Sequence, residues 1–157
     1  MASIKIILGA PCSGKSSHVA ANAKAGDVRI DYDKIAKAIG SDTDHNATGS
    51  VRDIALSMRW TAIYKIMDGI DADAWIIHTA PDESLISKYT EAGAQFIMLD
   101  TTEEDCIARA EADDRPEGTI ETIKNWFSNK PALEAAIKQS SAKSIQNYFK
   151  QAITKCV

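Results

Sequence analysis

The chain has 157 residues and a formal net charge of -4 at pH 7. This length suits a single compact domain, 1–157, and is too short for two domains of ordinary size. The negative balance excludes a generally basic surface, so a nucleic-acid partner would have to be bound by a local basic patch.

The cysteines and the apolar runs predict the compartment. Cys12, Cys106 and Cys156 have neither a paired spacing nor a metal-ligand spacing, which predicts free thiols in a reducing environment. No charged-then-apolar leader opens the sequence, and no apolar run approaches the ~20 residues that span a membrane. We therefore expect a soluble, cytoplasmic protein with no membrane partner and no obligatory protein partner.

A phosphate-binding loop follows the first predicted strand, since residues 4–17 read IKIILGAPCSGKSS. Gly9 and Gly14 enclose four residues and Lys15 and Ser16 follow, which matches G-x-x-x-x-G-K-[ST] between a strand and a helix. Glycines let backbone N–H groups converge on phosphate oxygens, and the helix N-terminus adds its dipole. We predict that Lys15 bridges the β- and γ-phosphates of ATP and that the Ser16 hydroxyl binds Mg²⁺. The alternative is a tight strand-to-helix turn with an exposed lysine. The expected contacts to ATP in this loop are Gly9, Pro11, Cys12, Ser13, Gly14, Lys15, Ser16 and Ser17.

An acidic pair follows the second predicted strand. A helix is expected from Lys15 to about residue 24, closed by Gly26, and a short strand at 27–30 then leads into Asp31 and Asp33. The carboxyl ends of parallel strands face the ligand crevice, so one of these carboxylates would stand opposite the terminal phosphate. The alternative is that one of them only caps the next helix, which ends near residue 40.

A polar loop at 41–50 precedes the third predicted helix, at about 51–67. We expect Val51, Ile54, Ala55, Met58, Ala62 and Ile66 to form its core-facing stripe. Arg52 and Arg59 are two turns apart on one face, where they either bind an acceptor phosphate or remain solvated, which we favour. His45 is interpreted as a loop residue, and the loop as a candidate flap.

The third strand, predicted at 74–79, ends at the same edge of the sheet as the phosphate-binding loop. His78 and Thr79 therefore reach the ligand crevice, and His78 is either a site residue or a hydrogen-bonded strand-end histidine. No acidic residue ends this strand, unlike many phosphate-loop nucleotidases. A helix from about Asp82 and a fourth strand at 94–99 follow.

The last third of the chain predicts an arginine lid at about 109–119. Thr101 or Thr102 caps a helix that carries Arg109; Pro116 and Gly118 end it, and Thr119 begins another. This arrangement places Arg115 between two helices, where a guanidinium can cover phosphates. The alternative is a surface arginine paired with Asp113 or Asp114.

Beyond Pro131 we expect one amphipathic helix with four core-facing apolar residues. They are Leu133, Ile137, Ile145 and Phe149.

Taken together, these segments resemble the small P-loop kinases, and among them the polynucleotide 5′-hydroxyl kinase domain of bacteriophages. The segments that carry the resemblance are GAPCSGKSS, DYDKIAKAI, IIHTAP and ARAEADDRPEGT. The resemblance implies an α/β three-layer sandwich with a mainly parallel sheet of about four strands. It also implies ATP-dependent transfer of the γ-phosphoryl group to a hydroxyl of DNA or a nucleotide, with ATP and Mg²⁺ as cofactors.

The same resemblance implies the roles of single residues. Asp33 would be the general base, with Asp31 as its alternate, and Arg109 and Arg115 would be lid arginines at the nucleotide. Asp31, Asp33, Arg52, His78 and Thr79 are the expected acceptor contacts. The sequence departs from the pattern at Ala36, where these kinases have an arginine, and at His78, where they have an aspartate.

The acceptor therefore stays open at this point. It is a polynucleotide 5′ hydroxyl or a hydroxymethylated base such as 5-hydroxymethyluracil in DNA. A kinase of a free nucleoside, nucleotide or small metabolite is the second interpretation. An ATPase or nucleotide-dependent switch that acts through a partner is the third.

Overall fold

The computed structural model describes the backbone of residues 2–155 and the side chains of residues 2–148 and 151. A four-stranded sheet forms its centre, with strand order β2-β3-β1-β4 and parallel pairing throughout. The strands are β1 (Ile4–Leu8), β2 (Val28–Ile30), β3 (Ala74–His78) and β4 (Gln95–Met98). β1 lies in the middle, with Leu8 in register with His78 on one side and Met98 on the other. The predicted α/β fold with a parallel sheet of about four strands is confirmed.

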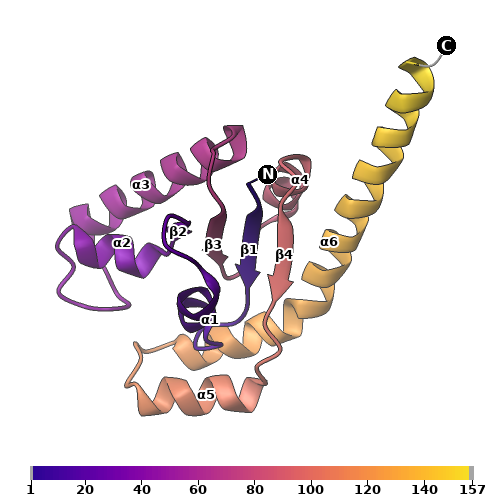
Figure 1. Ribbon diagram of the computed structural model, residues 1–157. Helices are drawn as coiled ribbons and strands as arrows, with labels where there is room; N and C mark the ends of the chain where they lie inside the picture. Colours follow the sequence, from indigo (N-terminus) through magenta and orange to yellow (C-terminus); the bar gives the residue numbers. More distant parts are fainter. Residues whose placement is uncertain (1, 156–157) are drawn as a thin grey trace.

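Six helices surround the sheet (Figure 1). They are α1 (Lys15–Asn22), α2 (Tyr32–Ala38), α3 (Gly49–Asp68), α4 (Glu83–Glu91), α5 (Glu103–Ala112) and α6 (Thr119–Lys155). Within residues 2–155 no helix has the length and apolar character needed to cross a bilayer.

Alternation along the strands divides the core into two faces. Ile6, Leu8 and Ile76 pack against α3 and α4, where Ile63 and Tyr89 are fully buried. Ile7 and Trp75, which point to the opposite face, pack against Val19 of α1. Helices therefore cover both faces, which is the predicted three-layer arrangement.

A third apolar cluster attaches α5 and the start of α6 below the sheet. Cys106 and Ala110 of α5 pack on Ile123 and Trp126 of α6 and on Ala10 beside the phosphate-binding loop. This contact holds the helix pair that carries Arg109 next to the loop. Cys12 and Cys106 are free thiols, as predicted, and Cys156 lies outside the described residues.

The stripe predicted for α3 is confirmed at Ala55 and Ile66 and is wrong at Ile54 and Met58. Ala55, Arg59, Ile63 and Ile66 face inward, whereas Ile54 and Met58 are exposed. The helix packs on both α2 and the sheet, and that orientation turns the face containing Arg59 inward. Counting apolar residues alone therefore assigned Ile54 and Met58 to the buried face of α3 and left out Arg59.

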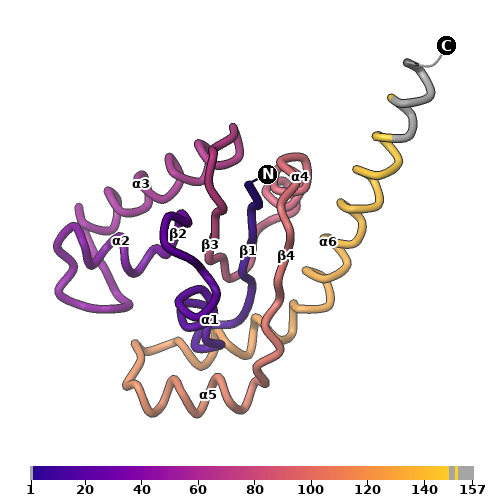
Figure 2. The backbone as a smooth tube through the Cα atoms, viewed as in Figure 1, coloured from indigo at the N-terminus to yellow at the C-terminus, as the bar shows by residue number. Residues whose placement is uncertain are grey.

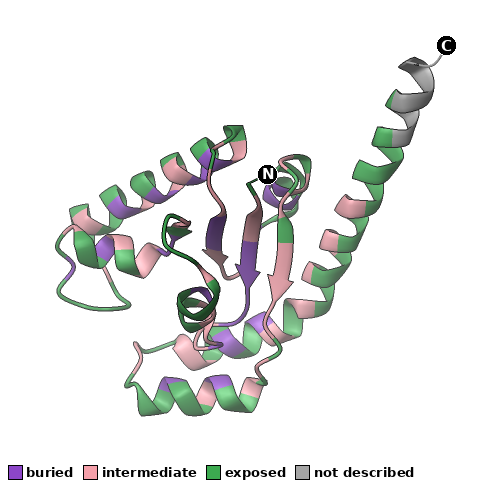
Figure 3. Ribbon diagram, in the orientation of Figure 1, coloured by how far each residue is buried: buried purple, intermediate pink, exposed green. Residues whose placement is uncertain are grey.

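The helix expected beyond Pro131 is the continuation of a single 37-residue helix, α6, in which Pro131 is internal. The helix changes direction along its length (Figure 1), as expected where a proline removes a backbone hydrogen bond. Leu133 and Ile137 pack on the core as predicted. The core position predicted for Ile145 is wrong, because α6 runs past the edge of the sheet and leaves this residue 57% exposed (Figures 2 and 3). Phe149 lies outside the described side chains.

Candidate active site

A cavity of about 1030 Å³ opens at the carboxyl edge of the sheet, beside the phosphate-binding loop. Most of the predicted site residues line it, although they come from five separate segments. They are Pro11, Cys12, Ser13, Gly14, Lys15, Ser16, Ser17, Asp31, Asp33, His78, Thr79, Arg109 and Arg115. Gly9 and Arg52 are the two predicted residues outside this lining.

The loop between β1 and α1 has a backbone that suits a phosphate cradle. Gly14 has φ 92° and Cys12 has φ 62°, so the chain turns through the left-handed region that exposes successive N–H groups. A Cβ at Gly9 would overlap the Ser13 hydroxyl, which explains the glycine there. Thr101, which sequence analysis considered only as a helix cap, donates a hydrogen bond to Ser13 O at 2.8 Å and braces the loop from the β4–α5 connection.

Lys15 is held inside the loop. Its Nζ donates to Gly9 O at 2.8 Å and to Ala10 O at 2.7 Å. Burial lowers the pKa of Lys15 to about 8, although the thiols of Cys106 and Cys12 and the carboxylates of Asp31 and Asp33 act in the opposite direction. The ammonium is thus largely charged at neutral pH, and it is held by the two loop carbonyls at the wall of the cavity.

Ser16 and Asp31 meet at the base of the cavity. The Ser16 hydroxyl donates to Asp31 Oδ2 at 2.7 Å, and Asp31 Oδ1 accepts from the Asp33 N–H at 3.1 Å. The helix-cap alternative is confirmed for Asp31, which is the N-cap of α2, and the same carboxylate also contacts the phosphate-binding loop; its role toward the terminal phosphate stays a prediction. Asp31 is buried, which keeps its carboxylate close to the phosphate-binding loop.

The donor set at this point fits a phosphate-bound magnesium ion. Among the described residues no group of three or more His, Cys, Asp or Glu side chains is placed to bind a metal. Mg²⁺ in nucleotide enzymes takes one or two protein oxygens and completes its shell with phosphates and water. The hydroxyl of Ser16 is an oxygen donor of that kind.

Asp33 lies at the mouth of the cavity and pairs with His45. The distance from His45 Nδ1 to Asp33 Oδ2 is 3.0 Å, and both side chains are partly exposed. His45 was interpreted as a loop residue; it is in the loop before α3 and also lines the cavity. Spacing in the sequence contains no signal for this pairing, because loop conformation decides it.

The two arginines of α3 differ in environment. Arg52 is exposed and lies 3.5 Å from the carboxylate of Asp53, so it stays outside the cavity. Arg59 is only 6% exposed and lines the cavity, so the solvated face we favoured is wrong for this residue. The sequence did contain a signal for the burial of Arg59, because this residue is spaced by four from Ala55 and Ile63 on the inward face of α3.

His78 ends β3 inside the cavity wall. Its ring makes edge contacts with Trp60 and Tyr89, and its Nδ1 is buried with no hydrogen-bond partner in the described structure. Burial, with the charges of Arg59 and Lys15, lowers the pKa of His78 to about 3. The side chain is thus a neutral imidazole and not the hydrogen-bonded strand-end histidine of the alternative.

The lid arginines approach the loop from α5 and its C-terminal connection. Arg109 Nη1 donates to Cys12 O at 3.3 Å. Arg115 lines the cavity, and its Nε lies 3.7 Å from an Asp113 carboxylate oxygen, too long for a hydrogen bond. Both predicted environments of Arg115, the cavity and the acidic neighbour, therefore occur together.

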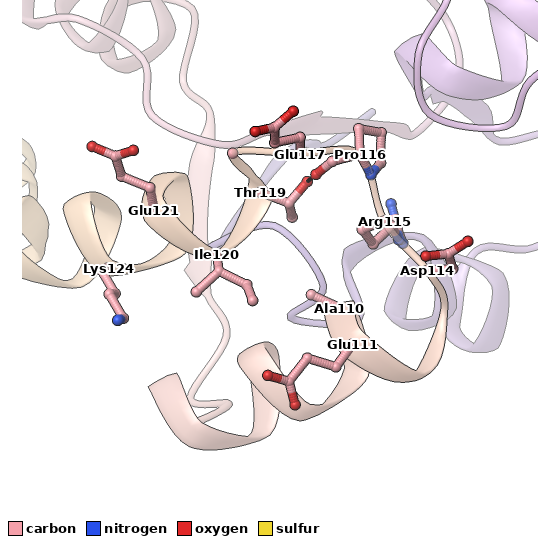
Figure 4. Close-up of a pocket in the computed structure, with 11 residues that line it drawn as sticks. Ala110, Glu111, Asp114, Arg115, Pro116, Glu117, Thr119, Ile120, Glu121 and Lys124 are labelled. Atoms are coloured by element: carbon pink, nitrogen blue, oxygen red, sulfur yellow. Dashed lines mark hydrogen bonds between the residues drawn. The ribbon is translucent and has the colours of Figure 1, made fainter.

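A second hollow of about 640 Å³ lies on the lid itself. Figure 4 shows Ala110 and Glu111 on one helix, Ile120 and Lys124 on the next, and Arg115 and Pro116 on the connection between them. Arg115 is common to both hollows, so the two hollows adjoin at this connection.

Comparison with known proteins supports the fold. No protein-family model and no curated protein matches the sequence. A solved structure, that of the Pnkp1/Rnl/Hen1 RNA repair complex, contains a chain that is similar in fold, with a TM-score of 0.61 and 16% identity. The match covers 90% of this chain and 46% of the other, so the chain spans less than half the length of that neighbour.

Proposed function

We propose that the chain is an ATP-dependent kinase that transfers the γ-phosphoryl group to a hydroxyl of DNA or a nucleotide. One observation carries the proposal: Ser16 of the phosphate-binding loop is hydrogen-bonded at 2.7 Å to Asp31, a carboxylate directly after β2. A phosphate-binding loop and a potential proton acceptor therefore share one cavity with two arginines of a lid.

The reaction uses these groups in a simple order. The acceptor oxygen forms a bond to the γ-phosphorus, while the bond from that phosphorus to the β,γ-bridging oxygen breaks. The hydroxyl proton passes to a carboxylate, and the products are ADP and a phosphate monoester. Loop amides, Lys15, Arg109 and Arg115 stabilise charge on the transferring group. Mg²⁺, bound through Ser16, would neutralise charge on the β- and γ-phosphates.

Asp31 is the better placed of the two candidate bases. A general base must lie within hydrogen-bond reach of the reacting hydroxyl, and the reacting hydroxyl must approach the γ-phosphate. Asp31 contacts the loop residue Ser16, whereas the Asp33 carboxylate points to His45 at the cavity mouth. In this proposal Asp33 contributes a helix-terminal N–H that holds Asp31, and its own carboxylate contacts the acceptor.

A nucleic-acid acceptor is supported by the fold neighbour, which belongs to an RNA repair complex, and by the resemblance of the sequence segments to polynucleotide kinases. The size of the cavity, about 1030 Å³, is sufficient for a nucleotide and a further group.

The test is transfer of label from γ-labelled ATP, in the presence of Mg²⁺, to a panel of acceptors. The panel contains 5′-hydroxyl oligonucleotides, duplex DNA with 5-hydroxymethyluracil, free nucleosides and nucleotides, and a pool of small metabolites. Lys15→Ala is the blank. Label in either DNA acceptor supports the proposal and separates strand ends from bases. Label only in metabolites, or release of free phosphate alone, contradicts it and favours a metabolic kinase or an ATPase.

A further inference from the structure

Arg59 is a buried cation on the acceptor side of the cavity. Its Nη2 donates to Ile77 O at 3.1 Å, and its guanidinium lies 5.0 Å from the centre of the Trp60 ring. Within the described part of the chain no carboxylate lies within ion-pair distance of it, and Ile77 O is its one hydrogen-bond partner. A guanidinium has five N–H donors, so most of its hydrogen-bonding capacity is unused.

A buried arginine with so few hydrogen-bond partners and no ion pair lowers the stability of the folded protein. Burial lowers the pKa of Arg59 below its usual value, because removing a charge from water is unfavourable unless a partner compensates. The strand carbonyl and the Trp60 ring hold the side chain in one orientation, and the group lines the cavity. The partner that completes it is therefore a ligand that enters the cavity and carries negative charge.

The neighbouring polar groups lead to the same conclusion. His78 lies within electrostatic range of both Arg59 and Lys15, and its buried Nδ1 has no hydrogen-bond partner among the described residues. In a neutral imidazole one ring nitrogen carries a proton, so His78 can donate to an anion without adding charge. Arg59 and His78 are thus two incompletely bonded polar groups in one part of the cavity wall.

The phosphates of ATP do not require these groups. The loop, Lys15, Arg109 and Arg115 line the same cavity and in the proposed function supply the donors to these phosphates. Arg59 comes instead from α3, and Asp31 raises its pKa through its charge, so Arg59 lies within electrostatic range of the proposed base. An anion bound by Arg59 would therefore belong to the acceptor.

We propose that Arg59, assisted by His78, binds a phosphate group of the acceptor, so that the preferred acceptor carries a phosphodiester or phosphate beside the nucleoside that is phosphorylated. A planar guanidinium fork matches a phosphate with two parallel hydrogen bonds. This inference rests on the proposed kinase function and assigns Arg59 and His78 to recognition of the phosphate of its DNA or nucleotide acceptor.

The test removes the charge from the ligand and from the protein in turn. Two dinucleotides with a 5′ hydroxyl are compared, one with a phosphodiester and one with an uncharged methylphosphonate linkage. A second pair of dinucleotides has the same two linkages and contains 5-hydroxymethyluracil as the base to be phosphorylated. For the wild type we expect the KM of the charged acceptor to be about 30-fold lower than that of the uncharged one, as loss of a buried charged contact implies.

Arg59→Met should raise the KM of the charged acceptor by about 30-fold and leave that of the uncharged acceptor and the Kd for ATP unchanged, because only acceptor binding is affected. Arg52→Met is the matched control, since Arg52 is on the same helix but exposed, and it should change neither KM.

Four outcomes are distinguished. Equal KM values for both linkages in the wild type overturn the inference, as does an equal effect of Arg59→Met on both. If Arg59→Met does not fold, the wild-type linkage comparison decides, together with Arg59→Lys, which keeps the charge but not the fork and should retain part of the preference. Absence of transfer to every acceptor in the panel overturns the proposed function itself, which is a separate result from transfer without linkage preference.

Discussion

The two sides of the cavity were predictable to different degrees. The nucleotide side consists of one contiguous segment, 11–17, together with Arg109 and Arg115. The acceptor side is assembled from Asp31 at the start of α2, Arg59 on α3 and His78 at the end of β3, which are far apart in the sequence. A contiguous motif encodes its own geometry, whereas an assembled surface depends on how helices are oriented on the sheet.

The largest expected effect is on the nucleotide side. Lys15→Ala should lower phosphoryl transfer by about 10³-fold or more, because it removes a preorganised charge from the transferring group. Steady-state kinetics with γ-labelled ATP measures the change. Lys24→Ala, in an exposed position just beyond α1, is the control and should have no effect. A small loss in Lys15→Ala would mean that the contiguous motif is only a structural turn.

The next effect separates the two carboxylates. Asp31→Asn should lower kcat by about 10² to 10⁴-fold with the Kd for ATP nearly unchanged, as expected for loss of a general base. Asp33→Asn should mainly raise the KM of the acceptor. The reverse pattern would assign the base to Asp33, as the sequence resemblance implied, and would move the reacting hydroxyl toward the cavity mouth.

A third prediction concerns stability on the acceptor side. The pKa of His78 is about 3 in the folded protein and about 6.5 in an unfolded chain. The unfolded state therefore binds a proton that the folded state does not. The contribution of His78 to stability is complete above pH 6.5 and is lost as the pH falls toward 3, by at most about 1.4 kcal/mol per pH unit.

Urea unfolding of the wild type and His78→Gln between pH 7 and pH 4.5 measures this contribution. The variant should show a flatter dependence on pH. His18→Gln is the control, since His18 lies on α1 and outside the cavity. Parallel curves for the wild type and His78→Gln would mean that His78 is readily protonated and accessible to water.

The smallest effect is the pH dependence of ATP binding. With a pKa of about 8, Lys15 loses its charge in the free protein as the pH rises through 8, while bound phosphates favour the charged form. The Kd for ATP should therefore rise by about tenfold between pH 7 and pH 9. Titration calorimetry at several pH values measures it, and a dependence retained in Lys15→Met would assign it to another group.

The errors made from the sequence have a common cause. Ile54 and Met58 were assigned to the core-facing stripe of α3 from apolar residues alone and are exposed, because the inward face contains Arg59, which is held by Ile77 O and the Trp60 ring. Ile145 fits an apolar period in α6 but has no part of the sheet opposite it. In both cases periodicity identified a helix correctly and could not identify what lies against each face.

What the sequence by itself determined is local: the phosphate-binding loop, the acidic pair after β2, the break at Pro116 and Gly118, and the order of strands and helices along the chain. These features depend on glycine conformations, capping groups and periodicity within a few residues, so they can be predicted without tertiary contacts. Only the tertiary structure decided that Asp31 contacts Ser16, that Asp33 pairs with His45, and that Arg59 and the Nδ1 atom of His78 are buried at the cavity wall. Each of these depends on the angle at which separate elements pack, and that angle is set by the whole core.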